Sequence, residues 1–154
     1  MSELLVVVLL WLHAVATLVW LGGIVILLLV LLPAARQVLG ADAGKLLGEV
    51  SRRFTPLANG AIVLLLLSGA ALMVLGNGDS NGGRMWSMGP AMLFKLLLFL
   101  LMAAVHFYRG LVLAPQVANS AAGEEKVRLQ QWSLRLVKVN FAVGLTVLLL
   151  SAIV

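Results

Sequence analysis

The sequence predicts an all-α membrane protein, a four-transmembrane-helix bundle whose helices run up, down, up and down. The 154-residue chain is 62% hydrophobic and only 11% charged, and its mean hydropathy is +1.11, which excludes a soluble domain of this size. Four apolar runs, at about 4–32, 57–75, 90–113 and 134–154, can each cross a hydrocarbon core of roughly 30 Å. The connections between them are short, so we expect one integral membrane domain covering 1–154.

The first run, 4–32, is expected to be a membrane helix and not a signal peptide. The residues before it, Met-Ser-Glu, are acidic, and the run is far longer than the apolar part of a signal peptide. Proline at Leu32-Pro33 predicts its end. The stretch 34–54 mixes apolar and basic residues, which predicts a short amphipathic helix on the inner membrane surface.

The second run is expected to begin at Thr55-Pro56, an N-cap residue followed by a first-turn proline. A glycine- and asparagine-rich stretch, 76–83, predicts the turn that follows it.

The third run is expected to be capped by Ser87 and to end at Ala114-Pro115. The polar loop 116–131 then leads to the fourth run. No internal repeat is evident from the residues.

Basic residues are distributed unevenly along the chain. Nine of the eleven lie in or beside the first and third loops: Arg36, Lys45, Arg52, Arg53, Arg109, Lys126, Arg128, Arg135 and Lys138. The positive-inside rule then places these loops in the cytoplasm and both termini outside. We therefore expect a multi-pass protein of a bacterial or archaeal plasma membrane. Its net charge of +5 reflects this topology and predicts no nucleic-acid partner. The sequence leaves open whether the protein forms a homo-oligomer.

Ionisable side chains inside the apolar runs are the first candidates for function, because each costs at least ~2–3 kcal/mol to insert in the bilayer. They are His13, Lys95, His106 and Arg109. The last three share one face of the third helix, and His13 shares a face of the first helix with Trp20. His13 and Lys95 are expected at a similar depth in the outer half of the bilayer, so we expect them to face each other there. Lys95 and His106 are separated by about 16 Å along the axis, which places His106 out of reach.

Methionines gather in the outer half of the predicted bundle. Five of the six are there: Met1, Met73, Met85, Met88 and Met92. Thioether sulfur is a soft ligand that suits Cu(I), and imidazole also binds copper. The sequence predicts a metal site formed by His13 with Met73, Met88 and Met92. The alternatives are that the methionines only pack, that Lys95 extends to the interface, and that His106 and Arg109 bind lipid phosphate.

Short motifs add a resemblance to a known family. Leu12-His13, followed by Trp20-Leu21-Gly22-Gly23, resembles the first helix of the CopD-type copper-resistance membrane proteins. Arg53-Phe54, Pro56-Leu57, Ser68-Gly69 and the lysine before leucines at Lys95 resemble that family's later segments. The resemblance implies a copper-handling membrane protein.

A second pattern is similar to the HemJ-type protoporphyrinogen oxidases, four-helix proteins that bind haem b. His13, Trp20, Lys95 and His106 match its positions, and the resemblance implies that the histidine and the lysine are essential. The wholly aliphatic stretch 24–32 differs from the aromatic, Pro-Arg-containing segment of that pattern.

These observations give two functional hypotheses and one without chemistry. The favoured hypothesis is copper binding or copper transport across the membrane through the outer His/Met site. The alternative is a haem-b redox protein or a HemJ-like oxidase. There His13 serves as axial ligand and Lys95 holds a carboxylate of the porphyrin, and the cofactor-binding candidates are His13, Trp20, Lys95, His106 and Arg109. The third hypothesis is a purely structural membrane module. The sequence leaves enzymatic activity open.

Overall fold

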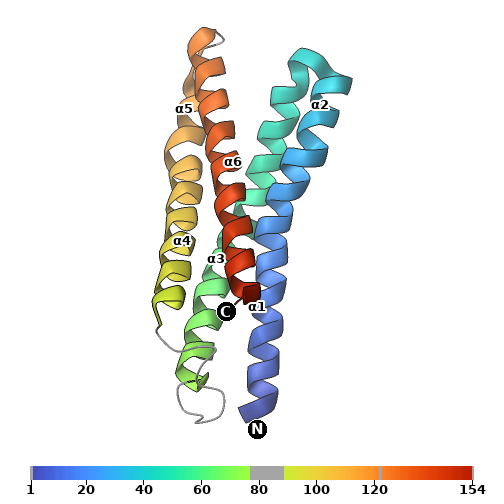
Figure 1. Cartoon of the computed structure of the whole chain (residues 1–154). Coiled ribbons are helices and arrows are strands. Elements are labelled where there is room, and N and C mark those ends of the chain that lie inside the picture. Colours follow the sequence, from blue (N-terminus) through green and yellow to red (C-terminus); the bar gives the residue numbers. More distant parts are fainter. Residues whose placement is uncertain (1, 77–88, 122, 154) are drawn as a thin grey trace. The chain divides into compact units, whose positions relative to one another are not determined.

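A computed structural model describes residues 2–76, 89–121 and 123–153, and these residues are helical almost throughout (Figure 1). The described part of the chain contains no strand, so the all-α prediction is confirmed. The chain folds as two compact units, Met1–Met88 and Gly89–Val154.

The first unit is a helical hairpin. Helix α1 (Ser2–Val25) continues through a π-helical turn (Ile26–Leu31) into α2 (Leu32–Leu39). A 3-10 turn (Gly40–Asp42) then reverses the chain into the long helix α3 (Ala43–Gly76). Gly40 has a φ of +52°, a value that favours glycine because it has no Cβ. The returning helix α3 lies beside α1, as Figure 1 shows in green and blue.

The second unit is also a helical hairpin. Helix α4 (Pro90–Tyr108) continues through a π-helical turn (Arg109–Leu113) into α5 (Ala114–Asn119). Helix α6 (Glu124–Ile153) returns beside α4. In Figure 1 these helices run from yellow to red.

The two hairpins follow the same plan, a repeat that is not evident from residue identities. In each, the first long helix widens into a π-helical turn, and a short helix with proline at its second position follows. Proline has no N–H, and its ring clashes with the carbonyl four residues earlier. For Pro33 and Pro115 that carbonyl belongs to Leu29 and Leu111, which both lie in the π-helical turns. We infer that the wider turn accommodates the ring, so the helix continues past the proline.

Several predicted helix boundaries are wrong, because the helices continue past these prolines. The first helical run does not end at Pro33 but reaches Leu39, and the third does not end at Pro115 but reaches Asn119. The predicted surface helix 34–54 is instead divided between α2 and the start of α3. Since the Thr55 hydroxyl donates to the Ser51 carbonyl 2.8 Å away, Thr55-Pro56 lies inside α3 and does not cap it.

The last helix and the outer turn also differ from the prediction or lie beyond it. Helix α6 begins at Glu124, ten residues before the predicted start at 134. The predicted turn at 77–83 and the predicted cap Ser87 lie outside the described residues.

By length and apolarity, three candidate membrane spans are found in the described part of the chain where the sequence predicts four. Among the described residues, three helical stretches are long and apolar enough to cross a membrane: Glu3–Leu75, Pro90–Asn119 and Glu124–Ala152. The first stretch includes the turn at Gly40, so it contains both long helices of the first hairpin. Large apolar side chains are exposed along all of the long helices, as expected for a surface that meets lipid.

Candidate functional site

His13 is held against α3 by a chain of two hydrogen bonds. Its Nδ1 atom lies 2.9 Å from the Ser68 hydroxyl, and the Ser68 hydroxyl lies 2.6 Å from the carbonyl oxygen of Leu64. The imidazole also lies over Gly69, whose absent Cβ would be 3.4 Å from His13 Cε1. Ser68 is buried, with 2% of its surface exposed.

The geometry of these two hydrogen bonds determines which nitrogen of His13 carries the proton. The Leu64 carbonyl has no hydrogen, so the Ser68 hydroxyl must donate its only proton to that oxygen. Ser68 then accepts from His13, and Nδ1 is the protonated nitrogen. In the neutral imidazole this leaves the lone pair on Nε2. A histidine held in this way is arranged as metal-binding histidines are, with the second nitrogen bonded to a neighbouring group.

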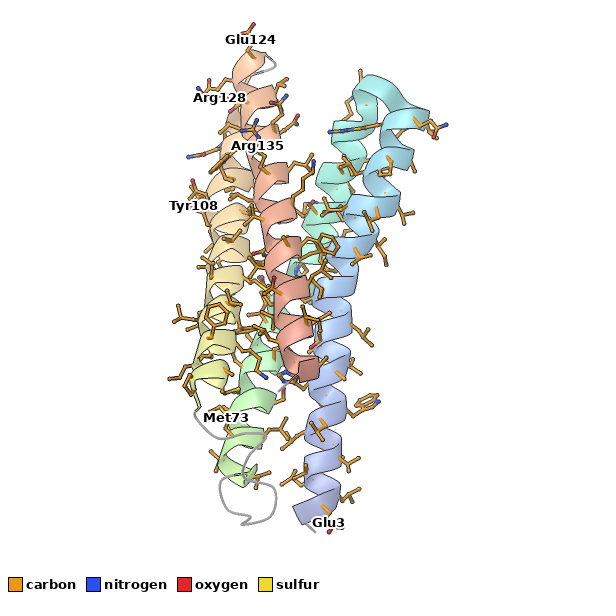
Figure 2. The ribbon with its side chains drawn as sticks, in the orientation of Figure 1. Glu3, Met73, Tyr108, Glu124, Arg128 and Arg135 are labelled. Carbon is orange, nitrogen blue, oxygen red and sulfur yellow. The ribbon has the colours of Figure 1, made fainter. Side chains whose placement is uncertain are left out.

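Met73 lies on the same helix as Ser68 and Gly69, one turn beyond Gly69. Four residues along α3 return to the same face and move about 6 Å along the axis. Figure 2 shows Met73 toward the end of the hairpin that carries Glu3 of α1. Its side chain is half-buried, as is that of His13. The first unit therefore places one thioether and one imidazole on neighbouring turns of two adjacent helices.

The other motif residues of the first hairpin explain how α1 and α3 approach each other. A Cβ on Gly23 would overlap the Phe54 ring, so glycine is required where this ring lies on α1. Trp20 is buried with 3% of its surface exposed. By the antiparallel order of the two contacts, Trp20 lies between the Phe54 and Ser68 levels, where Ala58 and Ala61 of α3 are buried. Small residues on one helix thus face large ones on the other.

The second hairpin buries another histidine. His106 is 8% exposed, and Met102, one turn earlier, is 4% exposed. Asn140 of α6 is equally buried and donates from Nδ2 to the Met102 carbonyl at 3.1 Å. The rings of His106 and Phe107 meet edge to face, with their centroids 5.6 Å apart. The Met102 backbone therefore lies against α6, and His106 is buried one turn further along α4.

Arg109 is held at the π-helical turn after α4. Its Nε atom donates to the Ser133 hydroxyl at 3.1 Å. This bond and the bond from Asn140 to Met102 fit one antiparallel register of α4 against α6. Arg109 thus has a side-chain partner inside its own hairpin.

The remaining predicted site residues are in the second unit or outside the described residues. Lys95 and Met92 are half-buried on α4, and Met88 lies outside the described part of the chain. Since His13 and Met73 belong to the first unit and Met92 and Lys95 to the second, the pairing of His13 with Lys95 stays a prediction.

Sequence reasoning missed the partners that hold these side chains. Neither Ser68 nor Ser133 was predicted to bind His13 or Arg109, although Ser68 is a hydroxyl within a long apolar run. Thr17, one turn after His13 on α1, donates to the backbone carbonyl of His13, 2.9 Å away.

Comparison with known proteins gives the family of this chain. The family model described as copper resistance protein D, CopD, matches residues 48–154. No curated protein and no solved structure matches the chain. The matched range covers Ser68, Lys95 and His106 and begins inside α3, so α1 with His13 precedes it. Because this range is more than half of the chain, the protein belongs to the CopD family of copper-resistance membrane proteins.

Proposed function

We propose that this protein binds copper within the membrane, at a site formed by His13 together with Met73, Met88 and Met92. The proposal joins the family relationship, which points to copper, to the chemistry of the side chains. Imidazole and thioether groups are the ligands that suit Cu(I). Copper is here the substrate, which the protein binds or passes across the membrane.

The observation that carries the proposal is the hydrogen-bond chain from His13 through Ser68 to the Leu64 carbonyl. It leaves Nε2 of His13 with a lone pair and fixes the direction in which the ring points. Metal-ligating histidines are commonly oriented by such a second bond, and loss of it weakens metal affinity. Met73, one turn beyond Gly69 on α3, is the methionine nearest in sequence to the residues of this hydrogen-bond chain.

The proposal further requires that the two hairpins form one four-helix domain. We propose the up-down-up-down bundle, with the ends of α1 and α3 that carry His13 and Met73 on the outer side of a bacterial or archaeal plasma membrane. Met88 and Met92 then supply the remaining thioethers, and Met102 with His106 on α4 offers a route inward. The basis is the distribution of basic residues.

The direct test is Cu(I) binding by the purified full-length protein in detergent, in competition with the chelator bathocuproine disulfonate. We expect His13→Ala to weaken Cu(I) binding at least tenfold, since an imidazole ligand is removed. Replacement of Met73, Met88 and Met92 together by leucine should have a similar effect. His106→Ala is the matched control, because it removes a histidine of the second hairpin that is outside the proposed site.

Two results would contradict the copper proposal. One is a wild-type protein that takes no Cu(I) from the chelator. The other is a His13→Ala variant that binds as tightly as the wild type. Equal losses in His13→Ala and His106→Ala would place the site elsewhere.

Haem b is the second candidate ligand, because the lone pair on Nε2 of His13 could equally bind iron. In that case His13 would bind the haem iron and Lys95 would hold a propionate. The absorption spectrum of the same purified sample separates the two candidates. A Soret band that His13→Ala removes would replace the copper proposal by a haem protein.

A further inference from the structure

Two arginines and a tryptophan share one side of α6, near its first residue. Arg128, Trp132 and Arg135 follow one another at spacings of four and three residues, which place them on one face. Together with Leu129 and Gln131 they line an open hollow of about 380 Å³. Figure 2 shows both arginines in the part of α6 that follows Glu124.

Neither arginine is neutralised within the described part of the chain. There, Arg128 and Arg135 form no ion pair with a carboxylate, and both side chains are exposed. Three of the basic residues near the other turn differ. Lys45 binds Asp42 at 2.8 Å, and Arg52 and Arg53 bind Glu49 at 2.9 and 2.7 Å. The hollow on α6 thus presents two cations that are available to an external anion.

The depth of the hollow follows from the register of the second hairpin. From Pro90 to the end of α4 at Tyr108 the helix rises about 27 Å, so an apolar core of roughly 30 Å that starts at Pro90 ends close to Gly110. The bonds from Asn140 to Met102 and from Arg109 to Ser133 place Trp132 opposite Gly110. Trp132 is 46% exposed, and tryptophan prefers this boundary between acyl chains and headgroups.

From these observations we propose that the Arg128–Trp132–Arg135 face binds the phosphate of an anionic phospholipid headgroup. Arg128 lies about one turn outside the boundary and Arg135 about one turn inside it, so their guanidinium groups can approach one phosphate from both sides. Guanidinium groups bind phosphate oxygens through paired hydrogen bonds. Trp132 rests on the glycerol and upper acyl region. This site is separate from the proposed copper site and does not depend on it.

The test uses native mass spectrometry of the full-length protein in dodecylmaltoside, titrated with dioleoylphosphatidylglycerol or with dioleoylphosphatidylcholine. We expect the wild type to bind the anionic lipid more tightly. R128Q/R135Q should weaken this binding by roughly 30-fold, and each single change by roughly fivefold, since each cation near a membrane surface contributes about equally. The single variants keep the test valid if the double variant does not fold.

The matched control is K45Q/R52Q, which removes two positive charges that are already bound to carboxylates. This control should retain the preference for phosphatidylglycerol. Equal losses in both double variants would show a diffuse charge effect and overturn the site. An absent lipid preference in the wild type, or one that survives R128Q/R135Q, would also overturn it. Displacement of the lipid by an equal concentration of inorganic phosphate would identify a site for the free anion instead.

Discussion

His13 on α1 and Ser68 on α3 are joined by a hydrogen bond of 2.9 Å between the imidazole Nδ1 and the hydroxyl. The same hydroxyl donates to the Leu64 carbonyl of its own helix, so serine both orients the imidazole and satisfies a backbone group. In a membrane, where water does not satisfy polar groups, this bond also keeps the imidazole inside the hairpin.

We predict that Ser68→Ala lowers Cu(I) affinity by roughly 10- to 100-fold, although serine itself is not a ligand. The reason is that loss of the second bond frees the His13 ring to rotate and to change tautomer. The chelator competition described above measures the affinity. Ser151→Ala is the control, because the Ser151 hydroxyl bonds the Val147 carbonyl of its own helix. An unchanged affinity in Ser68→Ala would separate the copper site from this hydrogen-bond chain.

Gly23→Ala is predicted to destabilise the first hairpin by about 1–3 kcal/mol, because the added methyl group overlaps the Phe54 ring. Gly22→Ala adds the same methyl group to the same helix, at a point where no packed neighbour among the described residues lies within 4 Å, and it should be neutral or stabilising. Thermal unfolding in detergent, followed by helical circular dichroism, compares the two variants. Equal stability of both would show that Phe54 does not pack on Gly23.

For the second hairpin, we predict that Asn140→Ala reduces stability by about 1–2 kcal/mol, since it removes a buried hydrogen bond between α4 and α6. Thr146→Ala is the comparison on the same helix. Thr146 is exposed, and its hydroxyl bonds the Ala142 carbonyl within α6. Unfolding in sodium dodecyl sulfate should therefore distinguish the two. A loss of stability in Thr146→Ala as large as in Asn140→Ala would contradict this assignment.

The proposed topology predicts which positions are accessible from outside the cell. The chain has no cysteine, so single cysteines introduced at Glu3, Ala41 and Ala121, all exposed, can be labelled without background. Only the cysteine at position 3 should react with an impermeant maleimide in intact cells, and the other two should react after lysis. The opposite pattern would move His13 to the cytoplasmic half.

We also predict that His13 and Lys95 lie at the same depth and face each other. Each lies twenty residues before the proline of its own hairpin, Pro33 or Pro115, and the two hairpins share one plan. Cysteines at the two positions should be joined by a bifunctional maleimide with a span of about 10 Å, one helix diameter. As a control, Leu97, exposed on α4, replaces Lys95 in the pair. Efficient cross-linking only with the control pair would show that Lys95 faces away from His13.

The family of this chain and its helical, membrane-embedded nature were accessible from the sequence. Composition and the long apolar runs are sufficient to predict the helices, because a bilayer leaves few other ways to satisfy the hydrogen-bonding groups of the backbone. The sequence also singles out Ser68-Gly69 and Gly22-Gly23, through the resemblance of these motifs to the CopD family.

Tertiary structure decided where the helices end and which partners the polar residues take. The sequence predicts that Pro33 and Pro115 end helices, but the π-helical turns before them accommodate the rings. That accommodation depends on the backbone several residues away and leaves no mark in residue type. The partners of His13 and Arg109, Ser68 and Ser133, depend on the register between two helices. Register is set by close packing such as Phe54 on Gly23, and helical periodicity gives the face of a residue but not its level against a neighbour.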